Sequence, residues 1–172
     1  MLYVTHSASE VARLADTLAV MEQGRVTALG PAASVLARID ALVMLGEDAG
    51  ALLDPTVSER DAPWRLVRVD FGGGSLWLGD SGLEIGRNVR LRVLARDVSL
   101  TTEPPRSTSI QNLLEGDVLA VAPDAHPSQA LVRVQCGESI LLARATMRAV
   151  DTLGVAPGTP VWVQVESVAL AT

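Results

Sequence analysis

The chain has 172 residues, with 14 Lys and Arg against 20 Asp and Glu, and a formal net charge of −6 at pH 7. This balance excludes nucleic acid as the main partner, because phosphate recognition needs clustered basic residues. Hydrophobic residues make up 48% of the chain, enough to bury a sizeable core, so global disorder is excluded as well. The sequence has no apolar run of about 20 residues, no signal-peptide pattern and a single cysteine, which together predict a cytoplasmic protein.

The first 40 residues predict an alternation of strands and helices in the order β-α-ββ-α. We expect residues 1–5 to form a short buried strand. Ser7 and Glu10 have the spacing of a capping box, which predicts a helix with Val11, Leu14 and Ala15 on its apolar face. A hairpin over residues 17–29 follows, and Pro31 opens a second helix over residues 32–39. Residues 41–62 mix turn formers with short apolar runs and are predicted to be a connector with a short helix.

From Trp64 onward the sequence alternates with period two, which predicts β-strands. Residues 103–107, with two prolines, mark a break in this pattern. Turn signals separate further candidate strands at the spacing of a small barrel or sandwich. These candidates are residues 116–121, 130–134, 140–143 and 161–165.

An internal repeat divides the β-rich region into two related units. Leu66-Val67-Arg68-Val69 recurs as Leu131-Val132-Arg133-Val134, and Val98-Ser99-Leu100 recurs as Val168-Ala169-Leu170. The repeat fits either two linked small barrels or one barrel-like body with strands exchanged between the units.

A histidine follows the first predicted strand. His6 at a strand end can hold a water in line with a phosphate, or it can be an ordinary histidine bonded to a nearby carbonyl. Its surroundings, which include Tyr3-Val4-Thr5-His6-Ser7, Leu14-Ala15-Asp16 and Gly24-Arg25-Val26, resemble the end of an ABC-transporter ATPase domain. The resemblance covers about residues 1–40 and implies that His6 is the catalytic switch-loop residue that contacts the γ-phosphate.

The remaining ATPase motifs do not occur in the sequence. There is no G-x-x-x-x-G-K-[ST] loop, no carboxylate pair for magnesium and no signature loop. We therefore expect no ATP hydrolysis by this chain alone, with ATP and magnesium bound only by a longer protein. A fragment and a miscalled gene start both explain the pattern.

A second polar motif lies after the proline-rich break. The hydroxyls and backbone N–H groups of Thr108-Ser109-Ile110-Gln111-Asn112, with Glu166-Ser167-Val168, fit either a tetrahedral oxyanion site or a polar turn that opens a strand. Residues 107–172 resemble the Mop module, the OB-like molybdate-binding barrel, and residues 94–100 resemble the regulatory region of molybdate importers. The whole chain thus resembles the C-terminal part of the ATP-binding subunit of a molybdate ABC importer.

The resemblance implies that Thr108, Ser109, Gln111 and Ser167 contact molybdate or tungstate. Family members often have Arg in place of Gln111 and usually Lys in place of Glu166. Glu166 would repel a dianion by about 1 kcal/mol per unit charge at ~4 Å in water. The two histidines, His6 and His126, lie far apart in sequence and predict no metal site.

The predicted fold class is an α/β remnant of an ABC ATPase domain followed by all-β OB-like barrels in two related units. We expect residues 1–50 to belong to the ATPase domain, residues 51–106 to form a TOBE-like unit and residues 107–172 to form the Mop-like barrel. The implied partners are a membrane permease and a second copy of the chain, with the protein peripheral on the inner face of the membrane. The alternatives are a stand-alone molybdate or tungstate storage module and a structural dimerisation region of an importer for another oxyanion.

Four further expectations concern residues outside these motifs. The isolated carboxylates, Asp97, Asp117 and Asp124, should be solvated. The tryptophans, Trp64, Trp77 and Trp162, should fill core or interface positions. Cys136 should be a small buried hydrophobe. Residues 1–40 should be poorly stable or self-associating, because their strands lack central partners.

Overall fold

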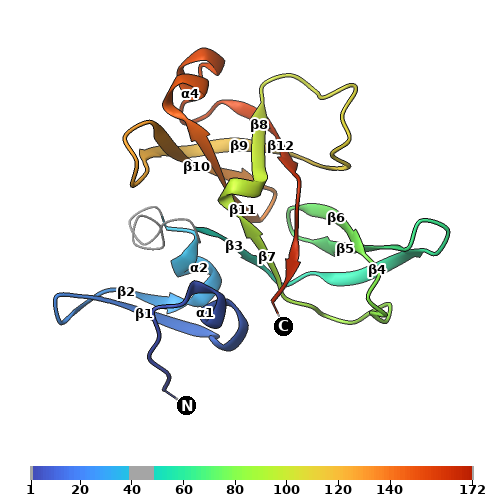
Figure 1. The fold of residues 1–172 in the computed structure, drawn as a ribbon, viewed down its shortest axis with the longest axis horizontal. Coiled ribbons are helices and arrows are strands. Elements are labelled where there is room, and N and C mark those ends of the chain that lie inside the picture. The colour runs from blue at the N-terminus through green and yellow to red at the C-terminus, as the bar shows by residue number, and fades with distance from the viewer. Residues whose placement is uncertain (1, 39–48, 172) are drawn as a thin grey trace.

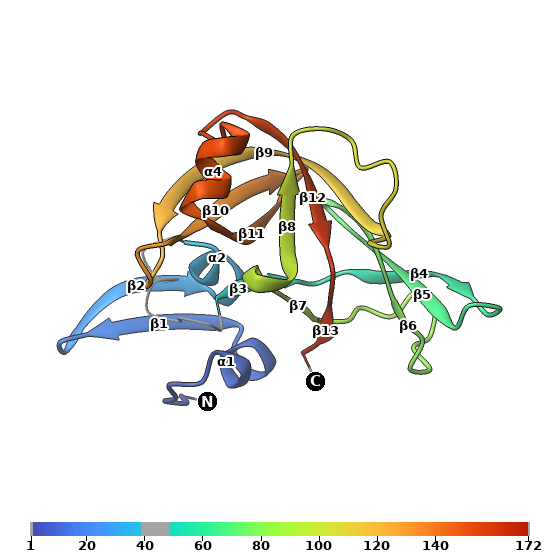
Figure 2. The ribbon, with the colours of Figure 1, turned by 45° about the horizontal axis from the view of Figure 1, so that its top comes forward.

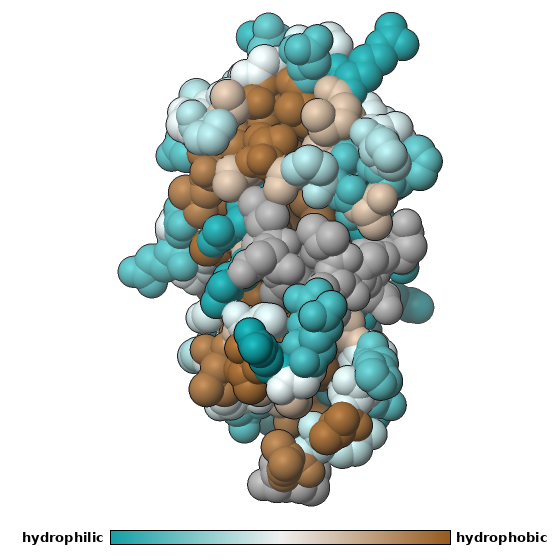
Figure 3. Space-filling view, turned by 90° about the vertical axis from the view of Figure 1, so that its left-hand side faces the viewer, coloured by the Kyte–Doolittle hydropathy of each residue, from teal (hydrophilic) through white to brown (hydrophobic). Residues whose placement is uncertain are grey.

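The computed structural model describes residues 2–38 and 49–171. Figure 1 shows a small α/β part at the N-terminus and a larger body of strands that holds the C-terminus. Figure 3 shows hydrophobic and hydrophilic side chains interspersed on the face at the left of that view. The N-terminal part contains four elements: α1 (Ala8–Leu14), β1 (Thr17–Glu22), β2 (Arg25–Pro31) and α2 (Ala32–Leu36). None of the helices in the described part of the chain has the length and apolar character needed to cross a membrane.

The N-terminal part confirms the predicted helix start and hairpin. The Glu10 backbone N–H donates to Ser7 Oγ over 3.4 Å at the start of α1, as the capping-box spacing predicted. Strands β1 and β2 form an antiparallel pair around a turn at Gln23-Gly24. Pro31 precedes α2, as expected. The last residue of the predicted second helix, Ile39, lies outside the described residues.

Two expectations for this part are wrong. Residues 2–5 form no strand, and Leu2 and Val4 are 94% and 83% exposed. Apolar residues favour a strand, but a strand also needs a neighbour to bond with, and β1 and β2 pair only with each other. The expected apolar face of α1 is wrong at Leu14, which is 49% exposed. Val11 and Ala15 do pack, partly buried, against the cluster that contains Ala12, and Ala8 and Ala12 are the fully buried residues of the helix.

The body contains two β units. The first comprises β3 (Gly50–Leu53), β4 (Thr56–Asp61), β5 (Leu66–Phe71), β6 (Gly74–Gly79), β7 (Leu91–Leu94), the short 3-10 helix η2 (Ala95–Asp97) and β8 (Val98–Thr101). The second comprises β9 (Asn112–Pro123), β10 (Gln129–Cys136), β11 (Ser139–Thr146), α4 (Met147–Leu153), β12 (Pro160–Val165) and β13 (Ala169–Leu170).

The strands of the second unit contain all four candidate strands predicted after the break. The connector expected over residues 41–62 is wrong for its second half, which forms β3 and β4. Residues 41–48 of the predicted connector lie outside the described ranges, and no helix occurs in residues 49–62.

The sheet topology confirms two related units and decides between the two arrangements. In each unit a hairpin forms the end of a sheet, β5–β6 in the first and β10–β11 in the second. The last strand of each unit crosses to the other: β8 pairs with β12, and β13 pairs with β7. The units therefore exchange strands, and the pairing crosses the predicted boundary at residue 106. Figure 2 shows the chain running from β12 down to β13 along this route.

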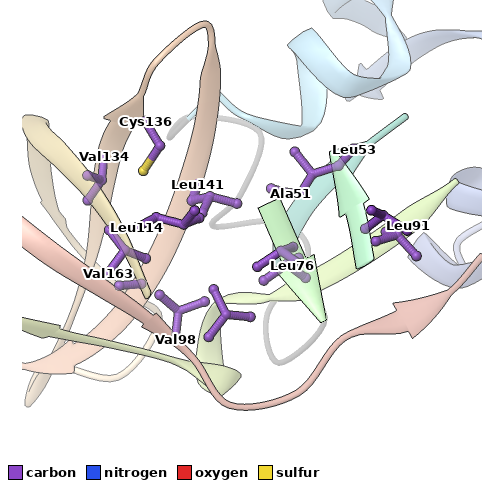
Figure 4. Close-up of a cluster of buried hydrophobic side chains, with 14 of the residues drawn as sticks. Ala51, Leu53, Leu76, Leu91, Val98, Leu114, Val134, Cys136, Leu141 and Val163 are labelled. Atoms are coloured by element: carbon purple, nitrogen blue, oxygen red, sulfur yellow. The ribbon is translucent and has the colours of Figure 1, made fainter. Parts of the chain in front are cut away.

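One hydrophobic core spans both units. Figure 4 shows Leu76 and Leu91 of the first unit near Leu114, Leu141 and Val163 of the second. Leu76, Leu91 and Leu141 are fully buried, and each such side chain contributes about 1.5–3 kcal/mol. The two units thus stabilise each other through shared packing as well as shared strands.

Cys136 belongs to this core, which confirms the expectation of a buried hydrophobe. Its side chain is 0% exposed, and burial, assisted by the nearby Asp117, raises the pKa of its thiol to about 11. The thiol is therefore protonated and unreactive at neutral pH.

The turns of the two equivalent hairpins contact each other. The Glu138 backbone N–H donates to the carbonyl oxygen of Gly72 over 2.8 Å. Gly137 has a φ of +54°, and a Cβ added there would lie 2.2 Å from that same oxygen. Only glycine fits this approach of backbone to backbone.

The expectation for Asp124 is wrong. Asp124 is buried rather than solvated: its carboxylate accepts from Arg144 Nε and from the Ala125 backbone N–H. Trp64 lies in the β4–β5 turn with 77% of its surface exposed, so it is not a core residue, and an interface position stays a prediction for it. Trp77 and Trp162 are half-buried.

Candidate oxyanion site

A cavity of about 340 Å³ lies between the first and second β units. Side chains from both units and from the segment before β9 line it: Leu66, Trp77, Ser109, Ile110, Gln111, Asn112, Val165 and Glu166. β6 of the first unit lies beside β9, and β9 pairs with β12, so the cavity lies where the two units meet.

Asn112 joins the two walls of the cavity. Its Nδ2 donates to the carbonyl oxygen of Trp77 over 3.0 Å, and its Oδ1 accepts from the Trp77 backbone N–H over 2.7 Å. Asn112 is also the register partner of Val165 on β12. The Asn112 side chain therefore satisfies both backbone hydrogen-bonding groups of Trp77 on β6 and fixes the distance between β6 and β9. No role beyond its place in the motif was predicted for Asn112, because its partner lies 35 residues away.

The structure brings together two of the four predicted oxyanion residues. Ser109 and Gln111 line the cavity, and both are exposed. Thr108 is adjacent, but its hydroxyl oxygen accepts from the Ile110 backbone N–H over 3.0 Å, which shapes the turn. Ser167 is exposed and follows Glu166 without lining the cavity.

The charge of the cavity comes from Glu166. Among the described residues that line it, none is basic, and Glu166 is the only charged one. The Glu166 backbone N–H donates to the carbonyl oxygen of Asp97 over 2.8 Å, which ties the end of β12 to η2. The Ser109 hydroxyl and the Gln111 amide offer neutral donors to an oxyanion, while the carboxylate of Glu166 opposes its charge.

A larger groove of about 600 Å³ lies elsewhere, over β9, β10 and β12. Glu115, Asp117 and Trp162 are among its lining residues, and none of the predicted oxyanion residues is. Two carboxylates disfavour an anion, so the smaller cavity is the better candidate despite its size.

His6 lies apart from this site. It is exposed in the segment before α1, where Thr5 Oγ1 donates to Glu10 and accepts from the Ser7 backbone N–H. All the described residues that line the cavity lie at position 66 or later in the sequence, so none belongs to the His6 segment. Within the described ranges, no three His, Cys, Asp or Glu side chains come together as a metal site.

Comparison with known proteins agrees with this organisation. The family model of the TOBE domain matches residues 108–171, the second β unit. The expectation that residues 51–106 are TOBE-like stays a prediction. The crystal structure of the cytoplasmic molybdate-binding protein ModG, with molybdate bound, superposes with a TM-score of 0.59 at 24% identity. The match covers 69% of this chain and 93% of the ModG chain, and it supports the fold.

Curated relatives match nearly the whole chain. The molybdenum import ATP-binding protein ModC of Methylococcus capsulatus is 58% identical over 170 residues, and that of Thiobacillus denitrificans is 48% identical over 170. The protein of the same name from Pseudomonas aeruginosa is 40% identical over 172 residues. Each match covers 99% of this chain but only 48%, 47% and 48% of the relative, so the chain spans about half the length of these relatives. The predicted resemblance is confirmed: from the segment around His6 to the last strand, this chain is similar to the ATP-binding subunits of molybdenum importers.

Proposed function

We propose that this chain is the C-terminal portion of the ATP-binding subunit of a molybdate ABC importer, and that its β region binds intracellular molybdate. The observation that carries the proposal is the 58% identity to such a subunit over 170 residues, which includes both the His6 segment and the β units. A stand-alone storage module would not account for the similarity of residues 1–40.

The ATPase chemistry would belong to the longer protein. There, ATP and magnesium would be held by motifs that this sequence does not contain, and His6 would contact the γ-phosphate from its place before α1. The subunit would work with a membrane permease, as a homodimer through the β region, on the inner face of the membrane.

The cavity between the β units would be the oxyanion site. Ser109 and Gln111 would donate hydrogen bonds to molybdate, and Asn112 would hold the walls at the right distance through Trp77. Without a basic residue in the described lining, we expect weaker binding than an arginine-lined or lysine-lined site would give. Neutral donors still discriminate between oxyanions by size, because the walls are fixed by hydrogen bonds.

Calorimetric titration with molybdate, against sulfate at equal ionic strength, tests the proposal. We expect saturable heat for molybdate only. Ser109→Ala should abolish or strongly weaken it, while Ser58→Ala, which removes an exposed hydroxyl on β4, should not. Glu166→Gln should tighten binding about fivefold to thirtyfold, the effect of removing a carboxylate at ~4 Å from a dianion in water.

One observation favours a second candidate function. The carboxylate of Glu166 in the cavity fits a structural region that no longer binds an oxyanion. Absence of heat for molybdate in both the natural chain and Glu166→Gln would support this candidate and would refute oxyanion binding.

A further inference from the structure

Arg90 connects the barrel body to the N-terminal part. It precedes β7, and its guanidinium contacts both parts of the chain. Its Nε donates to Asp54 over 3.1 Å in the first β unit. Its Nη1 donates to the Ala15 carbonyl oxygen over 3.2 Å, and its Nη2 pairs with the Asp16 carboxylate over 3.3 Å. We call these four residues the Arg90 clasp.

Ala15 and Asp16 belong to the Leu14-Ala15-Asp16 motif, to which the ATPase resemblance gives no task in this chain. Ala15 is the C-cap of α1, and its backbone N–H donates to the Val11 carbonyl. The Asp16 carbonyl oxygen accepts from the Ala32 backbone N–H over 2.9 Å at the start of α2. The corner at Ala15-Asp16 therefore fixes the end of one helix and the start of the next.

The C-terminal strand meets the clasp from the other side. The Ala171 backbone N–H donates to the Arg90 carbonyl oxygen over 2.9 Å. Ala171 also packs against the cluster formed by Ala12, Ala32, Leu36 and Leu52. Glu166, which lines the candidate site, is only five positions before Ala171 in the sequence, and β13 lies between them. Figure 2 shows β13 and the C-terminus close to β7, with α1 to their left.

We propose that the Arg90 clasp is the docking point of the β body on the segment that carries His6, and that occupation of the candidate oxyanion site stabilises α1 through it. Arg90 is a positioning residue in this scheme. The second half of the inference rests on the proposed function, whereas the first does not. The guanidinium suits the task because its planar fork can donate to a carboxylate and a carbonyl at the same time.

The expected size of the effect of Arg90 on α1 follows from the solvent exposure of its ion pairs. The Arg90 side chain is 28% exposed, while Asp16 and Asp54 are 93% and 61% exposed, so each ion pair alone is weak. A change in local opening of α1 is therefore the expected result, not global unfolding.

Hydrogen exchange of the α1 amides in the 172-residue chain, without ligand, tests the docking. Arg90→Gln should speed exchange in α1 several-fold. Asp16→Ala should speed this exchange less than Arg90→Gln does. In the Arg90→Gln background it should cause no further increase, because both substitutions remove the same Arg90–Asp16 contact. Arg60→Gln is the matched control, since Arg60 also bonds a carboxylate, Asp80, and a carbonyl, that of Leu83, but touches only the first β unit. Equal exchange in Arg90→Gln and Arg60→Gln, or additive effects of Arg90→Gln and Asp16→Ala, would overturn the docking.

The same measurement with saturating molybdate tests the coupling. The natural chain should exchange several-fold more slowly in α1, while Arg90→Gln should bind with the same heat and show no slowing. Heat of binding without slower exchange in the natural chain would refute the coupling. Absence of heat would refute the proposed function, and the ligand-free comparison would still decide the docking.

Discussion

The buried pair of Asp124 and Arg144 gives a prediction about stability. Their side chains are 2% and 6% exposed, and the carboxylate accepts from Arg144 and from the Ala125 backbone N–H over 2.7 Å. Arg144→Met keeps most of the packing volume but leaves a buried carboxylate with one donor. Removing one partner of such a pair costs about 3–5 kcal/mol, a large part of the 5–15 kcal/mol that holds a typical domain folded.

Urea denaturation, followed by tryptophan fluorescence and circular dichroism, measures this loss. Arg144→Met should lower the midpoint strongly with little change in slope. The double variant Asp124→Leu with Arg144→Met should recover most of the loss, because it leaves no buried charge. Arg68→Met is the control: Arg68 pairs with Glu59 and Asp70, all with side chains at least 40% exposed, and should cost at most ~1 kcal/mol. A loss no larger for Arg144→Met than for Arg68→Met would refute the reasoning.

Three other predictions concern the core, the hairpin turns and the cavity walls. Burial raises the pKa of Cys136 to about 11 in the folded chain, so its contribution to the free energy of unfolding should be fully present below pH 9. This free energy should fall by about 2–3 kcal/mol as the pH rises to 11, and it should fall less in Cys136→Ala. Denaturant unfolding at a series of pH values measures the difference. The new methyl group of Gly137→Ala would clash with the Gly72 oxygen. Gly154→Ala is the comparison: at φ +64° with open space around it, it costs only backbone strain of about 1–2 kcal/mol. Gly137→Ala should therefore have the clearly lower melting temperature. The side chain of Asn112→Asp can accept from the Trp77 backbone N–H but cannot donate to the Trp77 carbonyl. Chemical denaturation should therefore show a loss of about 1–3 kcal/mol in the free energy of unfolding, and Asn112→Ala should lose at least as much.

Period-two patterns predicted the β strands well because each strand reports its own buried face. Val67 and Val69 of β5 are fully buried, as their alternation indicated, and the repeat located the equivalent pair of hairpins. Local capping chemistry likewise predicted the start of α1 at Ser7.

Two of the failures, and the missed role of Asn112, concern partners distant in sequence. Whether residues 2–5 form a strand depends on a neighbouring strand, which their own composition does not specify. Asp124 finds Arg144 only because β9, β10 and β11 place Ala122, Leu131 and Arg144 in one row. The bond of Asn112 to Trp77 depends in the same way on the contact between units.

Strand exchange explains why the candidate site and the Arg90 clasp occur in one molecule. If β13 paired within its own unit, the residues after Glu166 would turn back toward β9 and would not reach Arg90. Because β13 instead pairs with β7, the segment that leaves the cavity runs alongside the strand that Arg90 precedes. The same exchange sends β8 to β12, so Glu166 bonds to Asp97 of the first unit. A ligand that displaced Ser109 or Glu166 would therefore act on both units at once. The pairing of β13 with β7 connects that segment to the Ala15-Asp16 corner through Arg90.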